Sequence, residues 1–483
     1  MGDHTAELET KRAKVTRPDA ALSSSSPPPS SSWSPSSWRT KHIAHQPRYE
    51  DVKHLSQVTD QLKSLPPIVQ PEEVDDLKRY LGEVAAGKRF ILQGGDCAER
   101  FVDCRQDRIE AKVKIMLQMS LVLVWGARVP LVRIGRMAGQ FMKPRSSDTE
   151  VVDGKTVETY KGDSINAFDP ADRKPDPERL LKAYFFASTT MNYVRGLMSC
   201  GFADLHHPSA WDLSFVRNTD KQRNYREMTE RICHALDFMQ ACGFRDDPSM
   251  RQAQLFSSHE GLLLPFEEAM TTTVASEQGG PSRHYNLGAH FLWIGDRTRQ
   301  LDGAHVEYFR GITNPIGIKV GPTTDPSELV QLIQRLSPSN EPGRITLITR
   351  FGVDKVKALL PPVIRAVQGA GLTVVWECDP MHGNTRKVEG SGIKTRSFED
   401  VLNELLHTFD VHAEQGTWLG GVHFEMTGDD VTECTGGSVG VSDDDLSTRY
   451  ESFCDPRLNY TQSLEMAFLI AKRLSRLQQP SKR

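Results

Sequence analysis

The sequence predicts an α/β fold, a (β/α)8 TIM barrel, and three observations support this prediction. Eight short apolar runs follow one another along the chain, and each ends in polar, charged or metal-binding residues. Stretches with the spacing of amphipathic helices separate most of these runs. The chain has 483 residues, 38% of them hydrophobic, which is enough for one large barrel with insertions. Because the carboxyl-terminal rim of such a barrel carries the active site, the same runs predict where catalysis occurs.

The eight candidate strands have apolar bodies, which is typical of parallel strands that are buried on both faces. In chain order they are Arg89–Cys97 (RFILQGGDC), Pro130–Arg136 (PLVRIGR), Gln254–Glu260 (QLFSSHE), His290–Arg297 (HFLWIGDR), Gly317–Pro322 (GIKVGP), Arg344–Arg350 (RITLITR), Thr373–Asp379 (TVVWECD) and Gly420–Glu425 (GGVHFE).

The candidate helices have apolar residues three and four positions apart, as a helix that covers a barrel requires. Pro71–Ala86 precedes the first strand, and Arg457–Leu477 is expected to form the last helix. Those between strands are Asp107–Val124, Glu260–Thr273, Thr298–Gly311, Pro326–Leu336, Asp354–Gly369 and Phe398–Gln415.

Three parts of the chain do not fit the strand and helix alternation. Residues 1–40 are rich in Ser and Pro, and we expect a disordered tail because such a segment buries too little apolar surface to order itself. Residues 41–483 are expected to form a single catalytic domain. Residues 41–88 would be its N-terminal extension, and about 176–250 a helical insertion between strands two and three that contains Pro177–Met198 and Arg223–Cys242.

Composition excludes several classes of protein. A net charge of −4 argues against a nucleic-acid-binding protein, which would carry an excess of basic residues. The eight cysteines form no CxxC pair, as expected for reduced intracellular thiols. The longest apolar stretch, Leu117–Ile134, is interrupted by Gln and Arg, so no membrane span is predicted. Asp3, Glu7 and Glu9 argue against a transit peptide, and the expected location is the cytoplasm.

Metal-binding side chains follow strands one, seven and eight, which become neighbours when the barrel closes. The candidates are Cys97, His382, Glu425 and Asp455, the last of these in the FCDPRLNY segment. A mixed set of sulfur, nitrogen and oxygen ligands suits Mn²⁺, Co²⁺ or Zn²⁺. Each of these residues alone could equally serve packing or hydrogen bonding. Their concentration on adjacent strand ends favours the metal.

Basic side chains form a second set at or just after the strand ends, which predicts a cleft that binds phosphate or carboxylate groups. Lys319 lies inside an apolar strand, and a buried lysine needs an anion or a shifted pKa. The remaining members could simply pair with nearby acids on loops. The set consists of Arg136, Lys143, Arg145, Arg297, Lys319 and Arg350.

Long motifs follow one another from about Pro47 to Leu477. They are GGDCAERF, RIGRMAGQFMKPRSS, FFASTTMNYVRGL, SSHEGLLLPFEEAM, LWIGDRTRQLDGAHVEYFRGITNPIGIKVGPT, VVWECDPMHGNT, GVHFEMTGDDVTEC and CDPRLNYTQSLEMAF. These motifs, in the same order, resemble those of one enzyme family, class II (plant-type) 3-deoxy-D-arabino-heptulosonate 7-phosphate (DAHP) synthase. The resemblance implies a transferase that condenses phosphoenolpyruvate with erythrose 4-phosphate at the start of the shikimate pathway, which leads to chorismate and the aromatic amino acids.

The resemblance also implies roles for single residues. Cys97, His382, Glu425 and Asp455 would bind a divalent metal, with Mn²⁺ the first expectation and Co²⁺ or Zn²⁺ the alternatives. Arg136, Arg297, Lys319 and Arg350 would hold phosphoenolpyruvate. The loop from Lys143 to Ser147, including Arg145 and Ser146, would place erythrose 4-phosphate. Glu260 would act as a proton carrier, and Asp296 stands where the family usually has Glu.

Our mechanistic hypothesis makes Lys143 the proton donor to the reacting aldehyde. Two other interpretations stay open: a Schiff-base aldolase with Lys319 as the nucleophile, and a barrel without catalytic activity. Cys454 precedes Asp455 and is either a plain buried thiol or the partner of Cys97 in a reversible disulfide. We expect a homo-oligomer, either a dimer or a tetramer.

Overall fold

The computed structural model describes residues 33–145, 147–152, 154–199, 226–227, 229–235, 238, 254–275 and 281–478. The architecture below belongs to the unit from Pro35 to Arg483. Most of the predicted tail, and half of the predicted helix Arg223–Cys242, lie outside the described residues. The boundaries of the tail and of the insertion stay predictions.

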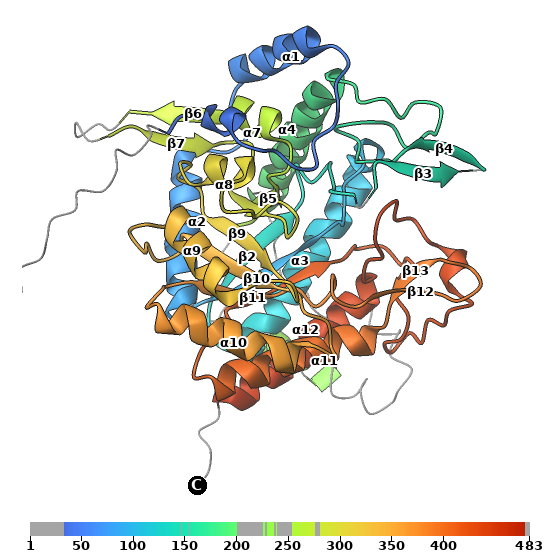
Figure 1. Cartoon of the computed structure of the whole chain (residues 1–483). Helices are drawn as coiled ribbons and strands as arrows, with labels where there is room; N and C mark the ends of the chain where they lie inside the picture. Colours follow the sequence, from blue (N-terminus) through green and yellow to red (C-terminus); the bar gives the residue numbers. More distant parts are fainter. Residues whose placement is uncertain are drawn as a thin grey trace, which may run out of the picture. The chain divides into compact units, whose positions relative to one another are not determined.

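Eight parallel strands close into a barrel with helices outside it, so the predicted fold class is confirmed (Figure 1). Their order around the barrel is β1-β14-β11-β10-β9-β8-β5-β2, and β1 closes it by pairing with both β14 and β2. The strands are β1 (Phe90–Gly95), β2 (Leu131–Arg136), β5 (Phe256–Glu260), β8 (Phe291–Ile294), β9 (Ile316–Val320), β10 (Ile345–Thr349), β11 (Val375–Cys378) and β14 (Gly421–Glu425). Each lies within one of the eight predicted runs, apart from Ile316 at the start of β9.

The strand register aligns the carboxyl ends on which the site prediction depends. Gly95, at the end of β1, pairs with Arg136 on one side and with Glu425 on the other. The barrel therefore carries a predicted anion-binding residue and a predicted metal ligand at the same level on the two neighbours of β1.

The main covering helices agree with the helical spacing in the sequence. Capping side chains mark some of their starts: Asp325 accepts hydrogen bonds from two backbone N–H groups of α9, and Ser397 accepts one in α11. The helices are α2 (Pro71–Ala85), α3 (Gln106–Ala127), α4 (Glu178–Ser199), α9 (Pro326–Leu336), α10 (Val356–Gly369), α11 (Phe398–Glu414) and α12 (Tyr460–Gln478), and α1 (Val52–Ser64) precedes them.

Two helix predictions are wrong over most of their length. The range Glu260–Thr273 contains only α7 (Leu264–Ala269), and Thr271–Val274 forms strand β6, which pairs with β7 (Arg283–Asn286). Three threonines and a valine in a row favour a strand because β-branched side chains are restricted in a helix. The range Thr298–Gly311 contains only α8 (Ala304–Phe309), which starts after Gly303.

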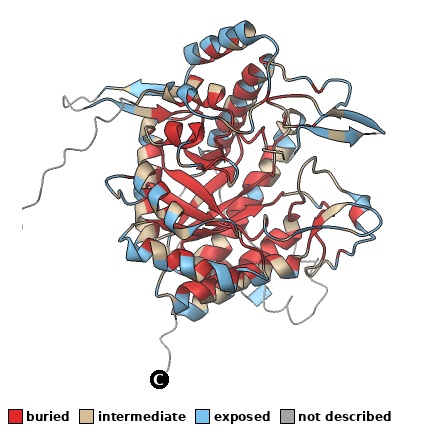
Figure 2. Ribbon diagram, viewed as in Figure 1, coloured by how far each residue is buried: buried red, intermediate tan, exposed pale blue. Residues whose placement is uncertain are grey.

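Short hairpins and 3-10 turns complete the described part of the chain. The hairpin strands are β3 (Thr149–Val152) with β4 (Lys155–Glu158), and β12 (Thr385–Lys387) with β13 (Lys394–Arg396). The turns are η1 (Ser37–Thr40), η2 (Phe101–Asp103) and η5 (Leu446–Thr448). Buried residues concentrate on the barrel strands and on the inner faces of the helices, while the hairpins are largely exposed (Figure 2). Within the described residues, no helix has the length and apolar content needed to cross a bilayer.

Candidate active site

A cavity of about 270 Å³ lies at the carboxyl ends of the barrel strands, where the sequence places catalysis. Predicted site residues from every part of the barrel reach it. Its lining consists of Cys97, Arg136, Gln140, Lys143, Pro144, Glu260, Trp293, Gly295, Asp296, Arg297, Lys319, Arg350, His382, Thr385 and Asp455.

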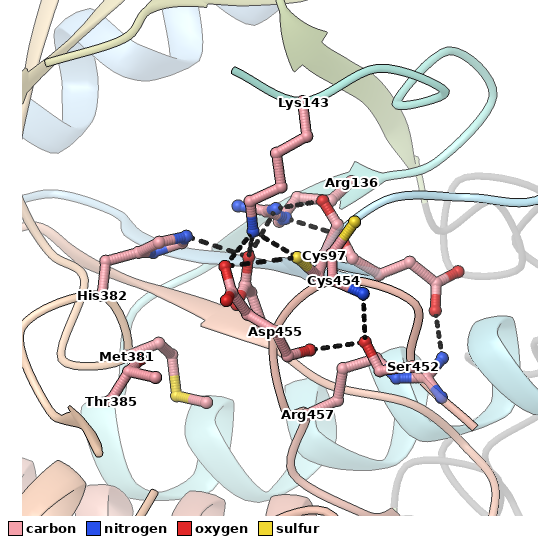
Figure 3. A network of polar contacts seen from close by, with 12 residues as sticks. Cys97, Arg136, Lys143, Met381, His382, Thr385, Ser452, Cys454, Asp455 and Arg457 are labelled. Carbon is pink, nitrogen blue, oxygen red and sulfur yellow. Dashed lines mark hydrogen bonds and ion pairs between the residues drawn. The ribbon is translucent and has the colours of Figure 1, made fainter. Parts of the chain in front are cut away.

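The structure brings the four predicted metal ligands together. The sulfur of Cys97 and carboxylate oxygens of Glu425 and Asp455 all lie within 4.8 Å of one another. His382 joins them, with its Nε2 atom 2.9 Å from Oε1 of Glu425 (Figure 3). Thiolate, carboxylate and imidazole groups at this spacing can coordinate one transition metal ion.

The predicted ligands already surround one positively charged group, the ammonium of Lys143. Their contacts with this ammonium show whether they suit a metal cation. The ammonium of Lys143 contacts both the Cys97 sulfur and Oδ2 of Asp455, and it lies 3.6 Å from Oε1 of Glu425 (Figure 3). Burial raises the pKa of Glu425, but His382, Lys143 and Arg396 outweigh burial and hold that pKa well below its usual value. The group is therefore anionic and attracts a cation, so its residues fit a divalent metal.

Lys143 is itself buried, and its charge depends on the same group. Burial lowers the pKa of Lys143, but Asp455, Cys97 and Glu425 reverse this effect and raise the pKa well above its usual value. The side chain points from its loop toward the ligand group (Figure 3). It can thus hold a proton close to any oxygen bound there.

The predicted anion-binding residues surround the same cavity. Nε of Arg136 donates to the carbonyl of Asp96 at 2.9 Å, and its NH2 group lies 3.1 Å from Oε1 of Glu425. NH1 of Arg350 lies 3.1 Å from Oδ2 of Asp296, and its NH2 donates to the carbonyl of His382 at 2.9 Å. These contacts fix the guanidinium planes beside the predicted metal ligands, in positions suited to phosphate or carboxylate.

Lys319 has the anionic partner that its burial required. Nζ of Lys319 lies 2.5 Å from Oδ2 of Asp379, and the same oxygen lies 2.7 Å from Nδ1 of His382. Burial lowers the pKa of Lys319, and Asp379 opposes that effect. Asp379 therefore connects the metal-ligand group with the anion-binding group, and it orients His382 as outer ligands commonly do.

Glu260 is a buried carboxyl group at the cavity wall. Its Oε1 atom has no hydrogen-bond partner within the described residues. A side chain at Gly295 would collide with this carboxyl group, so only glycine allows its position. Burial raises the pKa of Glu260, against the effects of Lys319, Lys143 and Arg136. This environment favours a group that carries a proton.

Asp296, Arg297 and Arg145 contact groups other than the predicted metal ligands. Asp296 accepts from Arg299 as well as Arg350, at 3.1 Å each, so the shorter side chain at this position contacts two arginines. Arg297 donates to the carbonyl of Pro144 at 3.3 Å. Arg145 does not line the cavity, and its guanidinium contacts Glu150 at 3.4 Å. Ser146 lies outside the described residues.

Sequence reasoning missed Arg396, which is fully buried in β13. Its NH1 group lies 2.7 Å from Oε2 of Glu425 and also donates to the carbonyl of Pro456, and its Nε donates to Thr385 at 3.0 Å. Arg396 is distant from any barrel strand in the sequence. The sequence offered one indication of its role: Arg396 is a basic residue in the segment between His382 and the next helix.

Sequence reasoning also missed Glu433, which shapes the loop that carries Asp455. Its carboxylate accepts from the backbone N–H groups of Ser452 and Arg457 at 2.9 and 2.8 Å, and from the Arg457 guanidinium at 2.8 Å. Arg457 in turn contacts Asp96, the residue before Cys97, at 2.7 Å. This buried network fixes Asp455 relative to Cys97.

Cys454 lies beside Cys97. The neighbouring Cys97 thiol lowers the pKa of Cys454 to about 7, with further help from Lys143 and Arg145, while burial raises the pKa of Cys97. A thiolate next to a thiol can form a disulfide when an oxidant removes two electrons.

Comparisons with known proteins show the family to which the chain belongs. A family model described as the class-II DAHP synthetase family matches residues 33–471. The chain is 52% identical to phospho-2-dehydro-3-deoxyheptonate aldolase of Neurospora crassa, over 93% of this chain and 96% of the relative.

Two bacterial relatives show comparable similarity. The enzyme of the same name from Streptomyces coelicolor is 48% identical over 90% of this chain and 96% of its own length. Phospho-2-dehydro-3-deoxyheptonate aldolase AroG of Mycolicibacterium smegmatis is 50% identical over 86% of this chain and 89% of its own length. The chain is therefore an enzyme, a transferase, and it belongs to the class-II DAHP synthetase family.

Proposed function

We propose that this enzyme condenses phosphoenolpyruvate with erythrose 4-phosphate, in a reaction that depends on a divalent metal and begins the shikimate pathway. The observation that carries the proposal is the single rim cavity in which an anionic ligand group and several cations meet. The products would be DAHP and phosphate. We further propose that it acts in the cytoplasm as a homo-oligomer.

Cys97, His382, Glu425 and Asp455 would hold the metal, with Mn²⁺ as the proposed ion. A divalent cation bound there supplies Lewis-acid polarisation of the aldehyde oxygen of erythrose 4-phosphate. The protein's own contribution at this position is the fixed geometry of the ligands, which Arg396, Asp379 and Glu433 maintain.

Arg136, Lys319 and Arg350 would bind phosphoenolpyruvate, with Arg297 at the outer edge of the cavity. These cations offset the repulsion between two phosphorylated substrates and hold them in a reactive orientation. Such positioning contributes up to about 7–11 kcal/mol in well-oriented reactions. The nucleophilic carbon of phosphoenolpyruvate then attacks the aldehyde carbon.

Lys143 would donate the proton that the aldehyde oxygen takes up as the new carbon–carbon bond forms. Its ammonium contacts the ligand group directly, which places Nζ next to an oxygen bound there. Glu260 would carry a proton to or from the phosphoenolpyruvate side, since burial favours its neutral form. Water adds to the cationic carbon, and phosphate leaves by cleavage of its C–O bond.

Removal of the metal provides the main test of this function. Incubation with EDTA should abolish DAHP formation in an assay with both substrates, and added Mn²⁺ should restore it. A Schiff-base aldolase that uses Lys319 would keep its activity in EDTA, and borohydride with substrate would trap a covalent adduct. Full activity without metal, or no consumption of phosphoenolpyruvate by the metal-loaded enzyme, would refute the proposal.

Oxidation of the metal-free enzyme should inactivate it reversibly. The oxidant diamide would take two electrons from Cys97 and Cys454 as their sulfur atoms join, which removes a metal ligand. We expect at least a tenfold loss of activity, measured after Mn²⁺ is added back, and recovery with dithiothreitol. The C454S variant should resist diamide. Equal inactivation of this variant would show that other thiols are responsible.

A further inference from the structure

A buried histidine lies between two of the proposed phosphoenolpyruvate-binding cations. Nε2 of His423 lies 2.5 Å from NH1 of Arg136 and 3.1 Å from Nζ of Lys319. The indole ring of Trp293 packs edge-on against the imidazole, with 5.5 Å between ring centroids. His423 is in β14, and it is fully buried below the cavity.

The two cations determine which nitrogen of His423 carries its proton. A guanidinium and an ammonium are donors only, so Nε2 must accept hydrogen bonds from them. A neutral imidazole has one N–H group, which must therefore be at Nδ1. The hydrogen bond at Nδ1 thus decides whether Nε2 can serve as an acceptor.

Gln93 supplies the acceptor for Nδ1. One atom of its side-chain amide lies 2.9 Å from Nδ1 of His423, and the other lies 2.9 Å from the hydroxyl of Ser258. Since Nδ1 donates, the amide atom that faces it must be the oxygen. The amide nitrogen then donates to Ser258, whose hydroxyl donates to the carbonyl of Gly135 at 2.9 Å.

The same amide oxygen faces the carboxyl group of Glu377. The two carboxyl oxygens lie 3.1 and 3.2 Å from it. Two oxygens at this separation repel each other unless one carries a hydrogen, so Glu377 must hold a proton. Its surroundings agree, because burial raises the pKa of Glu377 to about 8, and Asp379 adds to this effect while Lys319 opposes it.

We infer that Glu377, Gln93 and His423 form an uncharged hydrogen-bond relay that positions Arg136 and Lys319 for phosphoenolpyruvate. Glu377 donates to Gln93, which accepts from His423, which in turn accepts from both cations. The relay holds two like charges side by side and adds no negative charge to the carboxylates that already contact them, Asp379 beside Lys319 and Glu425 beside Arg136. Its members are positioning residues, and the inference rests on the proposed binding of phosphoenolpyruvate by these cations.

Equilibrium dialysis of labelled phosphoenolpyruvate against the Mn²⁺-loaded enzyme tests the relay without the second substrate. The H423F variant keeps a ring but loses the acceptor, and we expect the Kd to rise about tenfold or more, as for the loss of a hydrogen bond to a charged group. In turnover assays, the KM for phosphoenolpyruvate should rise by a similar factor, while kcat changes by less than about threefold. The H412F variant is the matched control.

His412 is a suitable control because it is a buried histidine in α11, remote from the cavity lining. Its replacement should lower thermal stability and leave the Kd unchanged. If H423F binds phosphoenolpyruvate as tightly as the wild type, the relay is refuted. If H423F does not fold, the Kd for phosphoenolpyruvate is measured with the Q93M variant instead. That variant removes the amide oxygen that accepts a hydrogen bond from Nδ1 of His423, so its Kd should rise in the same way.

The neutral state of Glu377 has its own test. In E377Q an amide N–H replaces the carboxyl O–H, so the Kd should stay within about twofold of the wild-type value, whereas E377L should weaken binding as Q93M does. Weak binding by E377Q would overturn the neutral assignment and make Glu377 an anionic partner of Lys319. A wild-type enzyme that binds phosphoenolpyruvate but forms no DAHP would refute the proposed function and leave the relay intact.

Discussion

The K143M variant is expected to lose about 10²–10⁴-fold in kcat, the range for removal of a general acid. Methionine keeps most of the length and apolar volume of lysine but has no proton to donate. The Lys143 ammonium lines the cavity and contacts two of the proposed metal ligands, Cys97 and Asp455, so its loss removes a proton donor from that position. Steady-state kinetics at saturating substrates would measure the loss, and metal analysis would establish that Mn²⁺ remains bound.

The K161M variant is the matched control. Lys161 is close to Lys143 through its backbone, since its carbonyl accepts from the Lys143 N–H at 2.9 Å. Its side chain instead forms an ion pair with the exposed Asp148 at 2.7 Å. We expect its kcat to stay within about twofold of wild type, because exposed ion pairs contribute little. Near-normal turnover by K143M would show that Lys143 is not the proton donor.

The R396M variant is expected to destabilise the protein by about 3–5 kcal/mol, as loss of one partner from a buried ion pair does. Arg396 is fully buried, and its removal leaves Oε2 of Glu425 and the carbonyl of Pro456 without this donor. The midpoint of urea unfolding and the Tm should both fall. Affinity for Mn²⁺ should fall as well, by about 10–100-fold, because Arg396 orients a proposed ligand.

The control for this variant lies on the same hairpin. Arg386, in β12, forms an ion pair with Asp443 at 2.5 Å, and both side chains are more than 40% exposed. R386M should change the free energy of unfolding by less than about 1 kcal/mol. Equal unfolding midpoints for R396M and the wild type would contradict the role of Arg396 in the core.

The barrel was predictable because its strands produce a strong local signal. Strands that are buried on both faces are rich in apolar residues, and in this chain most of the eight stand out between polar segments, although β5 (FSSHE) has a single apolar residue. The hairpins give no such signal. β12 is exposed along its whole length and β3 has no fully buried position, so neither shows a clear apolar alternation. The predicted helix Glu260–Thr273 includes Thr271–Thr273 because the residues before them have helical spacing.

Most of the site residues could be predicted from the sequence because barrel topology places the carboxyl ends of all strands at one rim. That rule brought Cys97, His382 and Glu425 together without any knowledge of their contacts. The same rule did not predict Arg396 or Glu433, which are on hairpins and loops beyond the rim. It also did not identify the anionic partner of Lys319, although the burial of Lys319 in an apolar strand showed that such a partner had to exist.

The sequence by itself determined the barrel, the rim that carries the chemistry, and the types of side chain gathered there. Only the tertiary structure decided which of these groups touch. Cys97 and Asp455 are 358 positions apart, and Arg136 and His423 are 287 apart. Contacts over such separations depend on barrel closure and side-chain packing, which local patterns do not encode. The charge state of His423 and Glu377 follows from those contacts, because a buried group takes its proton according to its neighbours.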